Sequence, residues 1–452
     1  MKGDFTRNTF DPLRGYSRVL MQQGRVCLDA DYNEQNAILI HNMRNLARDI
    51  GGRGWGRRAD AGFRVSLNYK QLLLSKGRYY VDGICCENST DSFQFPGLVV
   101  PEDPNYLVYI DVWERHVCAL QDPAIRETAL GGPDTCTRAK IEWRIGIEPI
   151  LEVPPTVTRN FLYSMLDESF LTDKRCMKAQ VKKNLSDTDP CSIPPESRFR
   201  GRENQLYRIE IHKGGPVWNG MTDPETGKPA GNVDVAATFK WSRDNGSVVF
   251  GIVKQNGNVV TLQSLGQDER TGLKTGDWVE ITDNDYERSC TPGIMAQVDK
   301  IDPVEMTITL KAPQDGSPEP VWKNYAEDDY RHPLVRRWDH HATGDMKMYG
   351  GAILLQENPS FNGGWLEIEC GIEINFPTQD YKRSYVSGDY WLIPARVATG
   401  SIEWPSDSMT GPLCLPPPGV EHHCAPLAWI SGENVNDIRC LISLPCDLPP
   451  VV

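Results

Sequence analysis

The sequence lacks the features that mark membrane-spanning, secreted and nucleotide-binding proteins. No apolar run approaches the ~18–20 residues that a helix needs to cross a bilayer. The first ten residues contain no apolar core of a signal peptide. Neither a P-loop nor a dinucleotide-binding glycine motif occurs, and there is no G-x-S-x-G serine elbow. We therefore expect a chain without a transmembrane segment that stays in the cytoplasm, or leaves it without a signal peptide.

Basic charge is also scarce. The 61 acidic residues outnumber the 48 lysines and arginines, which gives a net charge of −13. Proteins dedicated to nucleic acid usually carry a basic surface. The short basic turn 53–58 is an exception, but it follows a predicted helix and is typical of a solvent-exposed loop. The sequence thus argues against a nucleic-acid partner.

Cysteines are numerous but are not arranged as a known module. The chain has 13 of them and no C-x-x-C pair. Without a secretion signal, we expect most to be reduced and buried as small apolar side chains. The group near the C-terminus is the best suited to a disulfide or an adventitious metal: Cys414, Cys424, Cys440 and Cys446.

Length and strand patterns predict a mainly β, multidomain fold. With 452 residues, 39% of them hydrophobic, about three domains are expected. Alternating apolar residues predict antiparallel sandwiches plus a small SH3-like barrel, with an N-terminal hairpin-helix. The expected parts are a docking hairpin-helix with an antiparallel β domain (1–150), a proline-bracketed, partly helical connection (151–204), a β hairpin region (205–257), the small barrel (258–312) and a C-terminal β-sandwich (313–452).

The first fifty residues are the most distinctive part. Segments 16–21 and 25–28 are predicted to be strands that turn at Gln22-Gln23-Gly24. An amphipathic helix follows, for which Asp31 is the expected N-cap and Glu34 its capping-box partner. Apolar residues recur at helical spacing until Gly51-Gly52 ends the run: Leu39, Met43, Leu46 and Ile50. This unit has no arrangement suited to catalysis, and we interpret it as a docking element.

Three further β patterns are specific enough to test. Segment 236–253 is expected to be a hairpin that turns at Asp244-Asn245-Gly246. Four short strands between 258 and 312 predict a barrel of five strands. Strict alternation predicts one long strand over 365–376.

Two histidine doublets are the clearest chemical lead. His340-His341 and His422-His423 have Asp339 and Glu421 beside them, and neutral imidazole is a common metal ligand. Adjacent residues on a strand point to opposite faces, so each doublet offers only one ligand to a shared site. A metal-dependent hydrolase built on these histidines remains an alternative, although packing beside aromatic rings is the simpler interpretation.

Aromatic residues of the C-terminal part suggest another alternative. Tyr385, Tyr390, Trp391 and Trp404 are interleaved with polar residues, as in a carbohydrate-binding groove. That pattern would suit a fibre-tip adhesin or carbohydrate-binding module. Tryptophans flanked by apolar residues on strands are more often interior anchors, so we expect packing.

Long motifs carry a resemblance to a known family. They are MKGDFTRNTFDP with YSRVLMQQGRVCLDADYNEQN, ATFKWSRDNGSVVF (237–250), LKTGDWVEITD (273–283), RRWDHH (336–341), GDYWLIPARVATGSIEWP (388–405) and PPPGVEHHCAPLAWI (416–430). The chain resembles uncharacterised bacterial proteins that are encoded near phage-tail-like contractile injection systems. Cys27 and Tyr32 depart from the family's usual polar residue and Trp. The resemblance implies a baseplate or tail-associated component, and it supplies no catalytic residues to transfer.

We therefore expect a structural component of a contractile injection system or phage-tail-like particle, not an enzyme, and with no cofactor. It would act by protein–protein assembly with other subunits, as a homo-oligomer or in multiple copies. The expected location is a cytoplasmic assembly that is released from the cell or docked at a membrane within the particle. The interface candidates are Tyr16, Arg18, Gln22, Arg25, Asp31 and Glu34.

Overall fold

The chain forms two compact units, each built from several chain segments. The computed structural model describes residues 1–68, 71–94, 105–131, 134–150, 152, 154, 156–170, 175–182, 198–344, 346–359, 362–378 and 384–443. One unit, which we call the helix unit, comprises 8–115, 139–172 and 421–452; the other, the barrel unit, comprises 1–7, 116–138 and 173–420. The expected boundaries follow the chain, whereas both units are discontinuous in sequence. Residues 183–197 of the expected connection lie outside the described residues.

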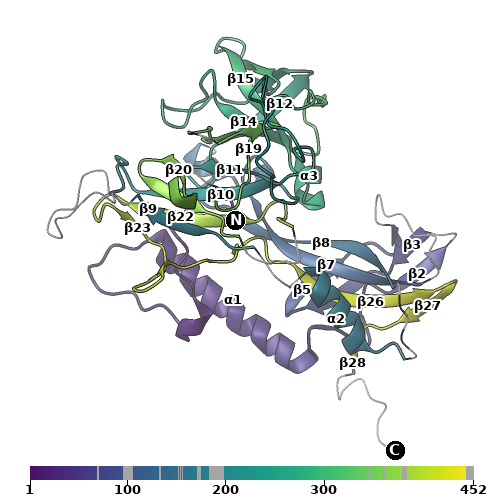
Figure 1. Ribbon diagram of the computed structural model, residues 1–452. Helices are drawn as coiled ribbons and strands as arrows, with labels where there is room; N and C mark the ends of the chain where they lie inside the picture. The colour runs from purple at the N-terminus through teal and green to yellow at the C-terminus, as the bar shows by residue number, and fades with distance from the viewer. Residues whose placement is uncertain are drawn as a thin grey trace, which may run out of the picture. The chain divides into compact units, whose positions relative to one another are not determined.

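In its described residues, the helix unit combines two α-helices and a short 3-10 helix with three small sheets (Figure 1). Its elements are η1 (Pro12–Arg14), α1 (Asp29–Gly51), β1 (Gly54–Arg57), β2 (Val65–Asn68), β3 (Gln71–Leu74), β4 (Gly77–Val81), β5 (Ile84–Asn88), β6 (Phe93–Gln94), β7 (Asn105–Val117), β8 (Arg138–Pro149), α2 (Arg159–Phe170), β26 (His423–Ser431), β27 (Asn434–Asp437) and β28 (Leu441–Ile442). The sheet orders are β28-β1-β4-β5, β2-β3-β6 and β27-β26-β7-β8. Val108, Ile110 and Leu427 are fully buried between these strands and anchor the core.

The predicted N-terminal hairpin is wrong, although its turn forms. No strand is present between residues 15 and 28. Gly24 has a φ of +69°, and the amide of Arg25 lies 3.4 Å from the carbonyl of Gln22, which closes the turn. The amide of Val19 donates instead to the Gln35 side chain of α1, at 2.8 Å. The segment therefore bonds to the helix and not to a second strand.

The predicted helix is confirmed, but its start is not where we expected. Helix α1 begins at Asp29, so Asp31 lies in the first turn and is not the N-cap. Leu28 occupies the cap position without a side-chain hydrogen bond. Carboxylates in the first turn still interact favourably with the helix dipole. The end is as predicted, with Gly52 at the C-cap at a φ of +81°.

The barrel unit contains a closed barrel and a six-stranded sheet (Figure 1). Its elements are η2 (Pro123–Ile125), η3 (Thr128–Leu130), β9 (Lys178–Val181), β10 (Gln205–Lys213), β11 (Thr238–Ser242), β12 (Val249–Asn256), β13 (Val259–Leu262), β14 (Trp278–Thr282), α3 (Asn284–Ser289), β15 (Ile294–Asp302), β16 (Thr307–Lys311), β17 (Leu334–Trp338), β18 (Met348–Tyr349), β19 (Ala352–Leu354), η5 (Asn362–Gly364), β20 (Leu366–Glu369), β21 (Ile372–Asn375), β22 (Tyr390–Arg396), β23 (Ser401–Ile402), β24 (Ser406–Asp407) and β25 (Gly411–Pro412). The sheet order is β18-β19-β11-β10-β22-β23, and the small sheets are β20-β21-β9 and β24-β25.

The barrel is confirmed, but it is larger than the predicted span of 258–312. Its strand order is β12-β13-β16-β15-β14-β17, which makes six strands and not five. The two strands beyond the predicted span, β12 and β17, lie on either side of it in sequence. Strand β17 pairs with both β12 and β14 and so closes the barrel. Because β17 lies far along the chain from the predicted span, no local sequence pattern assigns it to the barrel.

The predicted hairpin 236–253 is also wrong. Strand β11 pairs with β10 and β19 in the six-stranded sheet, whereas β12 pairs with β13 and β17 in the barrel. The turn has the predicted backbone, with a φ of +50° at Asn245 and +64° at Gly246. The turn therefore connects a strand of the six-stranded sheet to a strand of the barrel.

Segment 365–376 is a hairpin and not one strand. Strands β20 and β21 pair with each other, and Cys370 and Gly371 form the turn with φ values of +50° and +80°. Ile372 and Ile374 are fully buried, as their apolar alternation predicted. The mainly β, multidomain fold is thus confirmed, while several strand connections differ. No helix in the described ranges is both long and apolar enough to span a membrane.

One disulfide links distant parts of the barrel unit. Cys176 and Cys414 are bonded, with a sequence separation of 238 and their Cα atoms 5.4 Å apart. The neighbouring residues Met177 and Leu415 exchange backbone hydrogen bonds of 3.0 Å. Of the predicted C-terminal group, Cys424 and Cys440 are free thiols, and Cys446 lies outside the described residues.

We expect this disulfide to stabilise the barrel unit measurably. In the chain-entropy model, closing so long a loop in the unfolded chain is worth about 5 kcal/mol. Dithiothreitol should therefore lower the Tm of wild-type protein and leave the Tm of a Cys176→Ser/Cys414→Ser variant unchanged. Cys136→Ser, at an exposed free cysteine, is the matched control and should keep the wild-type response. A wild-type Tm that is indifferent to the reductant would contradict this prediction.

Candidate functional site

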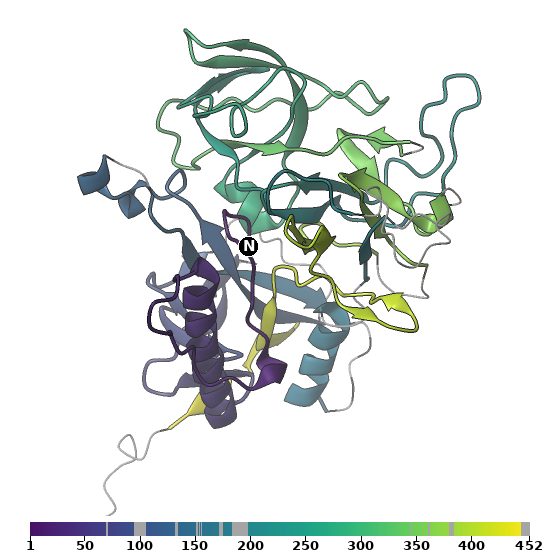
Figure 2. The same cartoon turned by 90° about the vertical axis from the view of Figure 1, so that its left-hand side faces the viewer.

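Helix α1 is held on one side by the chain that precedes it. The hydroxyl of Thr9 donates to Glu34 at 2.5 Å, and the ring of Phe10 lies 5.5 Å from that of His41. Ile38 is buried at 2% exposure. The residues before α1 run next to the helix in both views (Figures 1 and 2). Glu34 therefore holds residues 9–17, which we call the arm, against α1, and it does not form the predicted capping box.

The same side of α1 is also tied to the sheets of the helix unit. Arg44 lies 2.8 Å from the carboxylate of Glu114, and Arg48 lies 3.7 Å from that of Asp82. The backbone of Arg44 lies so close to Gly83 that a Cβ there would sit 2.4 Å from the Arg44 carbonyl oxygen. Only glycine fits this approach, so the sheet fixes the rotation of α1 about its axis.

The other side of α1 carries an apolar stripe that faces solvent. The exposed fractions of its members are all above one half: Tyr32 73%, Leu39 56%, Met43 66%, Leu46 61% and Ile50 65%. A helix on a globular protein normally turns such a stripe toward the core. Burying the exposed part of each side chain would be worth about 1 kcal/mol or more. We define these five residues as the α1 stripe.

The loop before α1 adds further exposed apolar residues. They are Leu13, Leu20, Met21, Val26 and Leu28. The predicted interface residues Tyr16, Arg18, Gln22 and Arg25 are exposed in the same loop, whereas Asp31 and Glu34 are half-buried on α1. A cavity of about 290 Å³ lies between the arm and the helix, lined in part by Tyr16, Glu34 and Ile38. The structure thus brings the predicted residues into one region of the helix unit.

The α1 stripe itself was not predicted as a candidate site. Its spacing was visible in the sequence, where it predicted only that the segment is a helix. The stripe is exposed because the opposite side of the helix is bound within the unit. There Glu34, Arg44 and Arg48 contact Thr9, Glu114 and Asp82, which lie outside the helix in sequence. Those partners cannot be identified from sequence spacing.

The two histidine doublets belong to different units of the chain. His340 and His341 belong to the barrel unit, and His422 and His423 to the helix unit. The residues that the structure describes contain no group of three or more His, Cys, Asp or Glu side chains that could hold a metal ion. The hypothesis of a metal site therefore has no geometric support.

Each histidine instead has its own structural contact. His340 is buried beside Trp278, and its Nε2 lies 2.7 Å from the carbonyl of Gly351. Burial lowers the pKa of His340 to about 4, which keeps it neutral. The ring of His341 meets that of Trp241 edge-on, with the ring centres 5.3 Å apart. The Nδ1 atoms of His422 and His423 lie 2.8 Å and 3.1 Å from different carboxylates, those of Asp111 and Asp82.

A buried charge cluster lies where the barrel meets the six-stranded sheet. Lys240 of β11 reaches Glu280 of β14 at 2.7 Å and Glu210 of β10 at 3.4 Å. Glu280 also accepts a 3.0 Å hydrogen bond from the indole of Trp338. Arg208 donates to Glu210 at 2.5 Å. These groups are all at most 4% exposed, so each charge depends on its partner.

The cluster also shifts the pKa values of its members. Burial alone would raise the pKa of Glu280, but the ammonium groups of Lys240 and Lys2 lower it below its ordinary value. Burial lowers the pKa of the neighbouring His212 to about 3. A buried lysine, two carboxylates and a histidine resemble the groups of an active site. Here the charges are paired with each other across two sheets, which is a structural arrangement.

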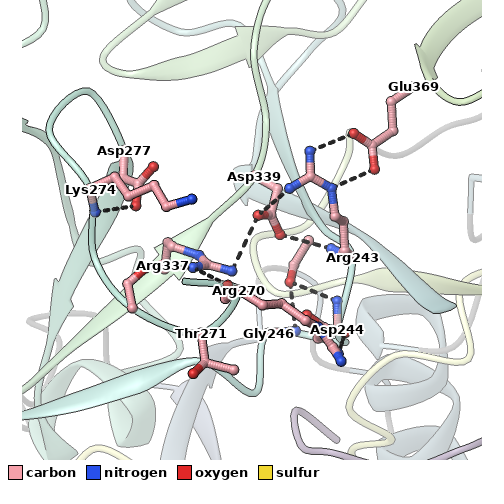
Figure 3. Close-up of polar contacts among 12 residues, drawn as sticks. Arg243, Asp244, Gly246, Arg270, Thr271, Lys274, Asp277, Arg337, Asp339 and Glu369 are labelled. Carbon is pink, nitrogen blue, oxygen red and sulfur yellow. Dashed lines mark hydrogen bonds and ion pairs between the residues drawn. The ribbon is translucent and has the colours of Figure 1, made fainter. Parts of the chain in front are cut away.

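A second polar cluster joins the turn after β11 to the strands around it (Figure 3). The guanidinium of Arg243 donates two 2.6 Å hydrogen bonds to Glu369, and these bonds raise the pKa of Arg243. The backbone amide of Arg243 donates to Asp339 at 2.9 Å. Arg337 lies 3.7 Å from the same Asp339. Arg270 reaches Asp244 at 2.8 Å. The arginines are matched to carboxylates of the same unit and fix the loops at this junction.

The aromatic residues that suggested a carbohydrate groove are interior residues. Tyr385, Tyr390 and Trp391 are at most 6% exposed. Trp404 is half-buried against the same core. The interpretation as packing anchors is confirmed for the three buried rings. Buried rings cannot line a carbohydrate groove, so these three residues give no support to an adhesin.

We expect loss of Lys240 to destabilise the barrel unit strongly. Lys240→Met leaves Glu280 and Glu210 buried without their shared ammonium, which typically costs about 3–5 kcal/mol. Lys254→Met removes a lysine of an exposed pair with Glu327 at 4.0 Å on the same barrel, and should cost less than about 1 kcal/mol. Urea unfolding followed by tryptophan fluorescence measures both. Equal losses in the two variants would refute the structural role of the cluster.

Comparisons with known proteins identify a family without a known activity. No curated protein and no solved structure matches this chain. A family model covers residues 1–149 and 151–446, which is almost the whole chain. The chain therefore belongs to the family of unknown function DUF6519.

Proposed function

We propose that this protein is a structural component of a contractile injection system or phage-tail-like particle, at the baseplate or a tail attachment. It acts by protein–protein assembly and not by catalysis, and it needs no cofactor. Its partners are other subunits of the particle. The particle forms in the cytoplasm and is then released or docked at a membrane.

The observation that carries this proposal is the α1 stripe. Five large apolar side chains on one helix, next to an exposed apolar loop, form a surface of the kind that marks protein–protein contacts. The predicted interface residues Tyr16, Arg18, Gln22 and Arg25 lie in that loop. The motifs that resemble proteins encoded near contractile injection systems begin in the same region, which supports an assembly role for it.

The arrangement of charged groups is consistent with this role. The lysines, arginines and carboxylates of the two clusters in the barrel unit are engaged with each other. The histidines of both doublets contact tryptophan rings, backbone carbonyls or single carboxylates. These groups support a rigid scaffold, and their engagement favours a structural protein over the alternative of a metal-dependent hydrolase.

The proposal is tested by following the protein during particle purification. We expect a tagged chain expressed from its own locus to sediment with tail-like particles at constant stoichiometry. A Leu39→Gln/Leu46→Gln variant should express normally but sediment at a level at least tenfold lower. The control, Val304→Gln/Met409→Gln, changes two apolar residues of the barrel unit that are even more exposed, and it should sediment like wild type.

Imaging of particles from a strain lacking the gene completes the test. We expect a missing density or a failure of assembly. Particles that are intact without the gene, together with a tagged chain that never sediments with them, would contradict the proposed function.

A further inference from the structure

The α1 stripe has the spacing of a coiled-coil seam. Apolar residues repeat with steps of four, three and four from Leu39 to Ile50, and Tyr32 lies one heptad before Leu39. In a heptad labelled abcdefg, the d positions are Tyr32, Leu39 and Leu46, and the a positions are Asn36, Met43 and Ile50. The seam spans almost three heptads, or about 27 Å of helix.

The contacts of α1 within its own unit follow the same register. The f positions lie opposite an a/d seam, and here they are Glu34, His41 and Arg48. Glu34 contacts Thr9, His41 contacts Phe10, and Arg48 contacts Asp82. The back of the helix is therefore anchored over its whole length while the seam faces outward.

The positions beside the seam favour a second copy of this chain as the partner. Partner choice in coiled coils is usually set by charges at e and g. Here those positions are almost uncharged: Asn33, Ile40 and Ala47 at e, and Gln35, Asn42 and Asp49 at g. Two copies can approach through this surface without like-charge repulsion, although the chain as a whole carries a net charge of −13. Neutral flanks also supply no charge pattern that would select a partner of different sequence.

Asn36 adds a preference for one register. A single polar residue at an a position is a common device that selects a parallel, in-register pair, because the two amides then meet and hydrogen-bond. Asn36 is half-buried on the free protein and is the one polar residue among the six seam positions. An out-of-register or antiparallel pair would place its amide against apolar side chains.

We propose that α1 pairs in parallel with α1 of a second copy, so that the α1 stripe forms a short two-stranded coiled coil. This inference deepens the proposed function, because it names a second copy of the chain as the partner that covers the docking surface. It rests on the proposed function only for the role of the dimer in the particle. Stable interfaces use roughly 20 residues on each side. The seam has far fewer, even with the neighbouring loop residues Leu20, Met21, Val26 and Leu28. We therefore expect a dissociation constant of roughly micromolar.

Sedimentation velocity of the purified full-length protein tests this inference. Wild-type protein should shift from 50.8 kDa toward twice that mass between about 1 and 100 μM. Met43→Lys places a charge at the centre of the seam and should weaken self-association at least tenfold. Asn36→Ile removes the polar position and should tighten association and allow species larger than a dimer. Val304→Lys, at an exposed site of the barrel unit, should behave as wild type.

Thermal melts keep the test interpretable, because an exposed substitution such as Met43→Lys should leave the Tm unchanged below the dissociation constant. Wild-type protein that remains at 50.8 kDa up to about 100 μM overturns the inference. A dimer that Met43→Lys leaves intact also overturns it, because the contact then lies elsewhere. Neither result contradicts the proposed function, since docking to a different subunit requires no self-association.

Discussion

The rotation of α1 about its axis is the constraint on which the functional account depends. Arg44 and Arg48 pair with Glu114 and Asp82, and Glu34 binds the arm through Thr9. Turning the helix over would bury its apolar side chains, but it would separate these groups from their partners and force the backbone of Arg44 away from Gly83. The polar side of the helix is therefore the side that is satisfied within the chain. Among the described residues, nothing covers more than about half of any side chain of the α1 stripe.

Polar contacts also fix the placement of parts inside the barrel unit. Lys240 and Glu280 join a strand of the six-stranded sheet to a strand of the barrel through a buried ion pair. Such pairs contribute little net stability compared with apolar packing, but they penalise arrangements that separate the partners. The pair thus favours one placement of the barrel on its sheet.

The sequence predicted element types better than their connections. The barrel, the mainly β composition and the end of α1 at Gly51 follow from periodicity and from glycine positions. The hairpin at 236–253 failed because a favourable turn at Asn245-Gly246 determines backbone direction but not which sheet the next strand joins. Strand β17 and the disulfide between Cys176 and Cys414 depend on contacts between distant residues, which leave no local pattern. The candidate site was found only in part, since exposure of the α1 stripe follows from Glu114 and Asp82, far from the helix in sequence.

The most direct test of the account is amide hydrogen exchange of the segment 15–51, measured in the dilute protein and in the purified tail-like particle. If α1 is the docking surface, its amides and those of the loop before it should exchange at least tenfold more slowly in the particle, while barrel strands such as β13 and β16 should not change. Exchange in 15–51 that is identical in the two states would contradict the claim that this protein works through α1.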